Sequence, residues 1–315
     1  MSPQPPGSPQ TTVDLPPPSL DESELLALSA DEARARADRL PLSTRFQLRA
    51  AVTPIQRAFL DVHGFLVFDR VMRDDEVSKM REEILDVQAR LLRDQTRTVF
   101  GVPVWVGADP DGQPMLQRTG FLSVQSAWVH DLVTDPRFEP VRHLIGADAR
   151  IGEREKDGVV LNRYVNAKGS LRPNLGWHTD AMRDLFYNRA VPGPMLNIGL
   201  HLDRIRPEDG GLRLLPGTHR DTFFWMAFRK AYFMDNRPDP REVAVETWPG
   251  DLTVHDGRAW HRVQASPHQG WRSLRTSLYI PYVNDAYQPK DEHSKGMWYL
   301  RVFDKWLQLR KKLGR

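Results

Sequence analysis

The chain has 315 residues, of which 40% are hydrophobic and 27% are charged. Its 44 Lys and Arg nearly balance 41 Asp and Glu, so the net charge of +3 gives no indication of nucleic-acid binding. Cysteine is absent, which excludes disulfides, thiolate metal sites and cysteine nucleophiles, and favours a reducing compartment such as the cytoplasm. No apolar window of about 18 residues or hydrophobic leader is present, so we expect no membrane insertion and no export.

The first part of the chain is expected to lie outside the main domain. Residues 1–20 are rich in proline and poor in apolar residues, so they are predicted to be a disordered tail. Residues 21–53 are predicted to form a peripheral helical region. Ser19 and Glu22 have the spacing of a capping box, and the helix that they would start must end before Pro41.

Residues 54–287 are predicted to form one domain. A short helix over residues 54–62 leads into an apolar strand at 65–68, and residues 75–92 repeat apolar side chains at helical spacing. Beyond residue 155 the pattern changes to short β-rich runs separated by Gly, Pro, Asn and Asp. These runs are residues 159–165, 196–202, 212–215, 252–254 and 276–283.

Helices followed by such strands predict a mainly β fold with flanking helices (α+β), built on a double-stranded β-helix, the jelly roll of cupins. Residues 223–234 are too aromatic for an ordinary loop and are interpreted as a lid or a partner surface. Residues 288–315 are predicted to form a basic C-terminal helix with an apolar stripe.

Three residues have the pattern of a metal site with two histidines and one carboxylate. Side chains at positions i and i+2 of a strand share a face, so His178 and Asp180 can converge on one ion. His261 would supply the third ligand from another strand. This set occupies one face of Fe(II) and leaves positions open for a bidentate co-substrate and for dioxygen. We therefore assign the catalytic metal to His178, Asp180 and His261.

An arginine follows His261 at the start of an apolar strand. Arg275 offers a rigid fork of donors that can hold the distal carboxylate of a keto acid, and Ser277 shares its face. Asn162 and Tyr164 share a face of an earlier strand and are further candidates for binding the keto acid, although plain packing explains them equally well. Arg272 is the alternative anchor.

Three longer stretches carry a resemblance to a known family. Residues 208–219, 57–68 and 249–261 resemble segments of the phytanoyl-CoA dioxygenase-like family, and the likeness covers about residues 54–285. The resemblance implies an iron(II)- and 2-oxoglutarate-dependent dioxygenase that consumes O2 and releases succinate and CO2. It implies hydroxylation of an unactivated C–H bond, with desaturation, epoxidation, cyclisation or epimerisation as alternatives. The aromatic residues 223–234 suggest that the substrate is a bulky, partly apolar small molecule, such as a secondary metabolite, a modified amino acid or a lipid-like acid.

Other histidines compete with the assigned ligands. His201 and Asp203 form a second His-x-Asp motif, which the family pattern disfavours because it precedes the turn at residues 210–211. His219 is expected to bind backbone carbonyls. His255 is expected to brace the loop that delivers His261.

The substrate is predicted less sharply than the metal. Aromatic and apolar side chains near the first ligands or in the aromatic segment could line its pocket; these are Trp177, Met182, Phe186, Tyr187 and Trp225. One alternative is a non-catalytic metal-binding sensor or binding module. Another is an oxygenase whose substrate is a protein or is tethered to a carrier. The sequence gives no prediction of the oligomeric state.

Overall fold

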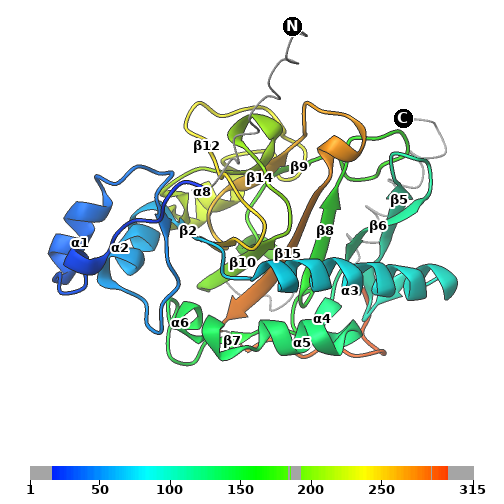
Figure 1. Cartoon of the computed structure of the whole chain (residues 1–315), viewed down its shortest axis with the longest axis horizontal. Coiled ribbons are helices and arrows are strands. Elements are labelled where there is room, and N and C mark those ends of the chain that lie inside the picture. Colours follow the sequence, from blue (N-terminus) through cyan, green and yellow to red (C-terminus); the bar gives the residue numbers. More distant parts are fainter. Residues whose placement is uncertain (1–15, 184, 186–192, 285, 297–315) are drawn as a thin grey trace, which may run out of the picture.

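Two facing β-sheets form the centre of the computed structural model, which describes residues 16–183, 185, 193–284 and 286–296 (Figure 1). The large sheet has the order β1 (Arg45–Phe46), β2 (Phe65–Phe68), β13 (Leu252–Asp256), β10 (Met195–His201), β15 (Arg275–Val283), β8 (Val160–Tyr164), β6 (Pro114–Thr119) and β5 (Trp105–Ala108), with β7 (Arg150–Ile151) beside β15. The small sheet has the order β12 (Val243–Ala244), β11 (Gly211–Leu214), β14 (His261–Gln264) and β9 (Leu175–His178). A separate hairpin joins β3 (Thr98–Val99) and β4 (Val102–Pro103).

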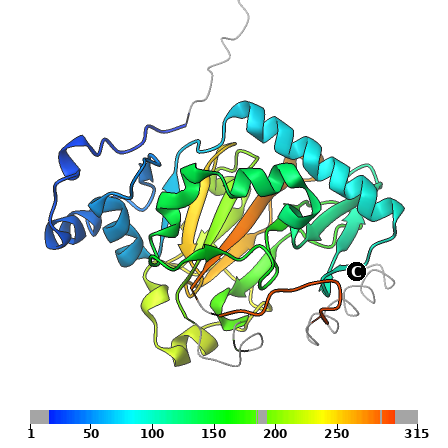
Figure 2. The ribbon, with the colours of Figure 1, turned by 90° about the horizontal axis from the view of Figure 1, so that it is seen from below.

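Helices cover the outer face of the large sheet. Figure 2 shows α3 (Asp74–Arg93) and α5 (Ala127–Val133) crossing that face. The remaining helices are α1 (Ala30–Ala37), α2 (Pro54–His63), α4 (Leu122–Gln125), α6 (Glu139–Arg142) and α8 (Phe223–Phe228). None of the described helices has an apolar stretch long enough to cross a bilayer.

Strand alternation gives the large sheet two different faces. Leu196, Ile198 and Leu200 of β10 point outward and share one buried apolar cluster with residues of α3. The alternate residues of the strand, Asn197 and His201 among them, point toward the small sheet because successive side chains of a strand lie on opposite faces. Polar side chains are therefore collected between the two sheets.

The strands and helices predicted between residues 54 and 287 agree with the observed ones to within one or two residues. The helix α2 shows the local reasons. Thr53 and Gln56 form a capping box at its start, Pro54 occupies its first turn, and Gly64 ends it with a φ of 81°. Glycine reaches that left-handed conformation without the steric cost that a Cβ atom brings.

The predicted capping box at Ser19 and Glu22 is wrong. The helix α1 begins later, after Ser29, whose side chain and that of Glu32 form the observed capping box. Glu22 is fully buried and instead accepts hydrogen bonds from Thr53 Oγ1 at 2.5 Å and from Gln56 Nε2 at 2.9 Å. Its carboxylate serves a neighbouring helix, a tertiary contact that spacing along the chain does not reveal.

The β5–β6 hairpin has no counterpart among the predicted strands, none of which lies between residues 69 and 158. It extends the large sheet next to β8 through the register Arg118↔Asn162. Two predicted segments lie largely outside the described residues: most of the N-terminal tail and most of the basic C-terminal helix, residues 297–315.

Candidate metal centre

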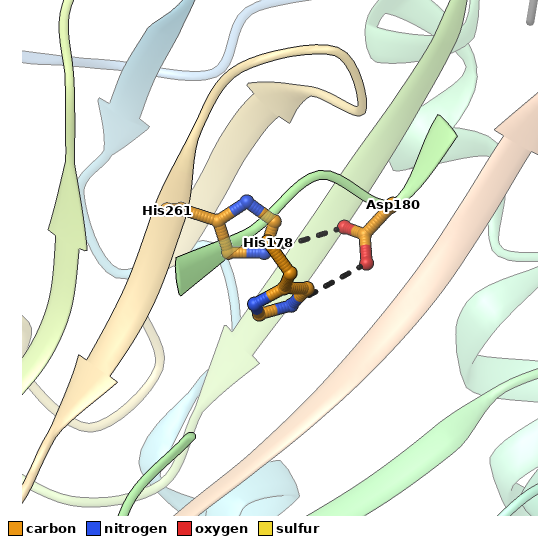
Figure 3. Close-up of side chains that lie close together, drawn as sticks. All are labelled: His178, Asp180 and His261. Atoms are coloured by element: carbon orange, nitrogen blue, oxygen red, sulfur yellow. Dashed lines mark ion pairs between the residues drawn. The ribbon is translucent and has the colours of Figure 1, made fainter. Parts of the chain in front are cut away.

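His178, Asp180 and His261 converge between the two sheets (Figure 3). The two histidines are direct partners on the antiparallel strands β9 and β14, and their ring centroids are 4.1 Å apart. Nε2 of His178 lies 3.8 Å from one Asp180 oxygen, and Nε2 of His261 lies 3.5 Å from the other. One ligand atom from each of the three lies within 4.8 Å of the others, so a single ion could contact all three.

Hydrogen bonds orient both imidazoles for metal binding. Nδ1 of His178 lies 2.8 Å from the Gly176 carbonyl, and Nδ1 of His261 lies 3.0 Å from the Ala259 carbonyl. A proton on Nδ1 satisfies each contact and leaves the Nε2 lone pair for the ion. Burial lowers the pKa of both histidines, which favours the neutral imidazole that a metal requires.

Two residues that were not predicted as metal ligands hold the Asp180 carboxylate. Asn197 Nδ2 donates a hydrogen bond of 2.7 Å to Oδ2, and His255 Nε2 lies 3.4 Å from the same oxygen. Burial alone raises the pKa of Asp180, but the nearby His261, His255 and His178 outweigh it and hold that pKa well below its ordinary value. The carboxylate is therefore ionised and fixed in orientation.

Strand register explains why these two residues meet. Asn197 on β10 and His255 on β13 are direct cross-strand partners. His255 was predicted to support the ligands without binding the metal, for example by bracing the loop before His261. It contacts Asp180, and its ring lies 4.6 Å from the His261 ring. No signal near Asn197 in the sequence identified it, because its role depends on the pairing of two distant strands.

The ligands line a cavity that opens between the sheets. The large sheet contributes Asn162, Tyr164 and Tyr279, and the small sheet contributes Leu175 and Val263. Further along, the wall carries aromatic and charged side chains from β6, the β5–β6 hairpin and loops, which include Trp105, Arg118, Lys156, Asp157, Arg172 and Arg183. The cavity therefore has the ligand set at one part of its wall and a group of basic side chains at another.

The predicted keto-acid residues fall into two groups. Asn162 and Tyr164 line the cavity, whereas Ser277 and Arg275 are buried on the same face of the sheet without lining it. Arg275 donates to the backbone carbonyls of Ser273, Gln264 and Pro173. These bonds occupy three of the five N–H groups of a guanidinium, so two remain.

Tyr164 lies between Arg275 and the cavity. The guanidinium carbon of Arg275 is 5.6 Å from the centroid of the Tyr164 ring, and Tyr164 lines the cavity. Burial lowers the pKa of Arg275 to about 10, so the side chain stays protonated at neutral pH. The alternative, Arg272, is exposed at the surface.

The predicted substrate residues are not gathered in the cavity. Trp177 is fully buried on the opposite side of β9 from His178, since adjacent strand residues point to opposite faces, and it packs with Trp260. Trp225 is 51% exposed on α8, and Met182 is half-buried outside the cavity lining. Phe186 and Tyr187 lie outside the described residues.

The aromatic segment 223–234 divides into two parts. Its first half forms α8, on which Phe224 and Phe228 are exposed. Its second half reaches the metal site, where Phe233 stacks on His178 with a centroid distance of 4.8 Å. A Cβ on Gly176 would lie 2.3 Å from the Phe233 carbonyl oxygen, so this approach requires glycine. The segment had been identified by its composition, but Phe233 had not been singled out.

The competing histidines lie away from the ligand set. His219 Nε2 lies 3.2 Å from the Asp61 carbonyl, as expected for a residue that binds backbone. His201 Nε2 lies 2.9 Å from Thr253 Oγ1, and burial lowers the pKa of His201 to about 3. Among the described residues, only His178, Asp180 and His261 form a group that could hold a metal ion.

Comparison with solved structures supports the jelly-roll assignment. EctD from S. alaskensis, solved with 2-oxoglutarate and 5-hydroxyectoine, is 19% identical, with a TM-score of 0.56 over 83% of this chain and 88% of that chain. HygX from Streptomyces hygroscopicus, solved with nickel and 2-oxoglutarate, is 19% identical, with a TM-score of 0.55 over 80% of this chain and 94% of that one. SnoN, a non-heme alpha ketoglutarate dependent epimerase from nogalamycin biosynthesis, is 20% identical, with a TM-score of 0.55 over 78% and 86%. The predicted fold is confirmed.

Comparison of sequences assigns the family. No curated protein matches the chain. The family model described as phytanoyl-CoA dioxygenase (PhyH) matches residues 60–273, a range close to that of the resemblance seen in the sequence. The chain therefore belongs to the phytanoyl-CoA dioxygenase (PhyH) family.

Proposed function

We propose that the chain is a non-haem Fe(II)- and 2-oxoglutarate-dependent oxygenase that oxidises a small, partly apolar molecule, most directly by hydroxylation. The observation that carries this proposal is the convergence of His178, Asp180 and His261 at the wall of a cavity. Two imidazoles and one carboxylate on one face of an ion are the ligand set of non-haem Fe(II) oxygenases. Family membership and the ligands in the EctD and HygX structures support the same chemistry.

The bound metal would supply dioxygen activation: 2-oxoglutarate loses CO2 to become succinate, one oxygen atom enters succinate, and the other enters the substrate. The protein's own contribution is to hold and orient the reactants. Asn197 and His255 fix the Asp180 carboxylate, and Phe233 covers one side of His178. Such fixed ligands keep the remaining coordination positions open for the co-substrates.

We assign the far carboxylate of 2-oxoglutarate to Arg275, with Ser277, Asn162 and Tyr164 as further contacts. Arg275 is a buried cation with two N–H groups that have no described acceptor, and it lies against Tyr164 in the cavity wall. Two parallel N–H donors can bind a carboxylate bidentately. Lysine would not reproduce this geometry, because its ammonium is a single point of charge.

The reaction type rests on how the substrate is held. SnoN is described as an epimerase, and another similar structure, SnoK from nogalamycin biosynthesis, as a carbocyclase. The same centre can therefore serve outcomes other than hydroxylation. Halogenation is disfavoured, because the Asp180 carboxylate takes the coordination position that a halide would need.

The first test is to add Fe(II) and 2-oxoglutarate to metal-free protein without oxygen and to record the visible charge-transfer band from iron to keto acid. We expect a band in the wild type, none in His261→Ala, and a band that requires more 2-oxoglutarate in Arg275→Ala. Absence of the band in the intact protein would contradict the proposal.

A second measurement separates an enzyme from a metal-binding sensor. With oxygen admitted, the oxygenase releases CO2 from 2-oxoglutarate, even slowly without substrate, whereas a sensor forms the band and releases none. A carrier-tethered or protein substrate would instead be indicated by association with an acidic carrier protein that weakens as salt is added.

A further inference from the structure

We propose that the primary substrate carries an oxyanion, a carboxylate or a phosphate, and that Arg172 and Arg118 bind this group against the Trp105 ring in the cavity. This inference rests on the proposed function, because it names the substrate class of the same site. Neither arginine was singled out in the sequence, and both line the cavity that contains the metal ligands.

Arg172 is a buried cation without an acidic partner among the described residues. Its side chain is only 3% exposed and lies between two aromatic rings, 4.6 Å from the centroid of Trp105 and 4.9 Å from that of Tyr164. Nη2 donates to the Tyr164 hydroxyl at 2.9 Å, and Nε has no hydrogen-bond partner. A guanidinium cannot escape burial by losing its proton, so it retains an unmatched charge.

Arg118 brings a second guanidinium to the same ring. It lies 5.3 Å from the Trp105 centroid, its Nη2 donates to Asp157 at 2.5 Å, and its buried Nη1 has no partner in the described part of the chain. The Asp157 carboxylate also accepts a hydrogen bond from Arg183 at 2.6 Å. Asp157 thus pairs with both Arg118 and Arg183, whereas no described carboxylate pairs with Arg172.

Arg45 shows how this protein neutralises a buried arginine elsewhere. Arg45 is as buried as Arg172, yet its guanidinium contacts both Asp69 at 2.8 Å and Asp251 at 2.6 Å. An unpaired buried charge is strongly unfavourable, so a missing counter-charge beside a cavity indicates a ligand that supplies it. An oxyanion that pairs with both guanidinium groups would supply the missing counter-charge.

The location suits substrate anchoring. The apolar walls Leu175, Val263 and Phe233 lie in the same cavity as the two arginines and the metal ligands. A molecule with an oxyanion at one end and an apolar body could therefore be fixed at the arginines while its body reaches the metal. Holding a reactive C–H bond in one place is how such a site selects the position of attack.

The test compares each anionic probe with a neutral partner that has the same apolar body. Binding of 4-phenylbutyrate and 4-phenylbutanamide, and of phenyl phosphate and phenol, is measured by isothermal titration calorimetry. Each titration uses metal-free protein and protein saturated with Ni(II) and 2-oxoglutarate, so a failure of the proposed metal function leaves this readout intact. We expect at least one anion to bind ten or more times tighter than its neutral partner, and which pair does so distinguishes carboxylate from phosphate.

Variants then assign the preference to residues. Arg172→Gln should abolish the preference, Arg118→Gln should weaken it, and Arg172→Lys should restore part of it because the charge returns. Arg36→Gln, at an exposed position on α1, is the control that should change nothing. Thermal unfolding of each variant shows that it is folded.

Two kinds of result would overturn the proposal. The first is equal affinity for anion and neutral partner in the wild type, absence of binding by either anion, or an unchanged preference in folded Arg172→Gln, which would make Arg172 a structural brace for Trp105 and Tyr164. The second is a loss of 2-oxoglutarate affinity in Arg172→Gln as large as in Arg275→Gln. That result would assign the two guanidinium groups to the co-substrate's carboxylate instead of the substrate's.

Discussion

Three His-x-Asp segments occur in the chain, beginning at His178, His201 and His219. The first two lie at strand ends, and only the first belongs to a described group that could hold a metal ion. His178 ends β9 and has His261 directly opposite on β14, so the third ligand arrives through strand pairing. His201 ends β10, and its direct partner on β15 is Ser277, which offers no imidazole. The same three-residue motif thus leads to different chemistry because its neighbours across the sheet differ.

The two aspartates differ as much as the histidines. Asp180 points into the cavity, where Asn197 and His255 hold it. Asp203 instead accepts hydrogen bonds from the backbone N–H of Thr276 at 2.5 Å and from Arg81 Nη2 at 2.9 Å. Because these two donors use the Asp203 carboxylate, its role is structural. The comparison teaches that a ligand is defined by its surroundings after folding.

The largest expected effect comes from replacing each of the two aspartates, Asp180 and Asp203, with alanine. Asp180→Ala should lower the affinity for Fe(II) by more than about 100-fold. This loss is larger than the one expected when a residue that only hydrogen-bonds to a metal ligand is removed. Turnover should be abolished. Asp203→Ala should retain metal binding and instead lower the free energy of unfolding by about 1–3 kcal/mol, because the Thr276 N–H loses its acceptor. Metal titration and chemical denaturation of both variants measure this contrast, and retained turnover in Asp180→Ala would refute the ligand assignment.

A smaller effect is expected from the residues that hold Asp180. Asn197→Ala and His255→Ala should each weaken metal binding by about 10–100-fold, because the carboxylate loses its fixed orientation. Asn166→Ala is a matched control: its amide donates to the backbone carbonyls of Ser266 and His268, so stability should fall without a change in metal affinity. Equal metal affinity in Asn197→Ala and Asn166→Ala would remove Asn197 from the site.

The smallest expected effect is on how the free energy of unfolding changes at acid pH. It tests whether His201 is a buried structural histidine. Burial lowers the pKa of His201 to about 3, so below an unfolded pKa of about 6.5 the unfolded chain binds a proton that the folded protein does not. The contribution of neutral His201 to the free energy of unfolding is present above about pH 6.5. It is lost as pH falls below that value, at about 1.4 kcal/mol per pH unit. His201→Gln should therefore make the decline in stability between pH 6.5 and 5 shallower in denaturation curves of the metal-free protein.

His130 supplies a control of opposite sign. Its Nδ1 lies 2.8 Å from Glu153 Oε2, and this hydrogen bond raises the pKa of His130. A raised pKa stabilises the folded protein fully below the unfolded pKa of about 6.5, and this contribution is lost as pH rises through the raised folded pKa. His130→Gln should therefore lower stability at acid pH without making the decline between pH 6.5 and 5 shallower, and should change the slope only above about pH 6.5. A shallower decline in both variants would mean that the histidines do not titrate as their surroundings indicate.

The sequence predicted well those features that depend on neighbouring residues. The start of α2 at Pro54, the strand β2 and the long helix α3 follow from capping residues and local periodicity. The wrong capping box at Ser19 shows the limit of such patterns: Glu22 has the right spacing, but Thr53 and Gln56 compete successfully for its carboxylate. Local spacing identifies a possible partner, and burial decides among the partners.

By itself, the sequence determined the residue types of the candidate metal site and the alternation that places polar side chains on one face of each strand. It could do so because the period of two in a strand is a property of the backbone. Only the tertiary structure decided that Asn197 and His255 meet at Asp180, that Phe233 stacks on His178, and that Trp105 lies beside Arg118 and Arg172. These contacts depend on register and packing between segments far apart in the chain, which are set when the whole domain buries its apolar surface.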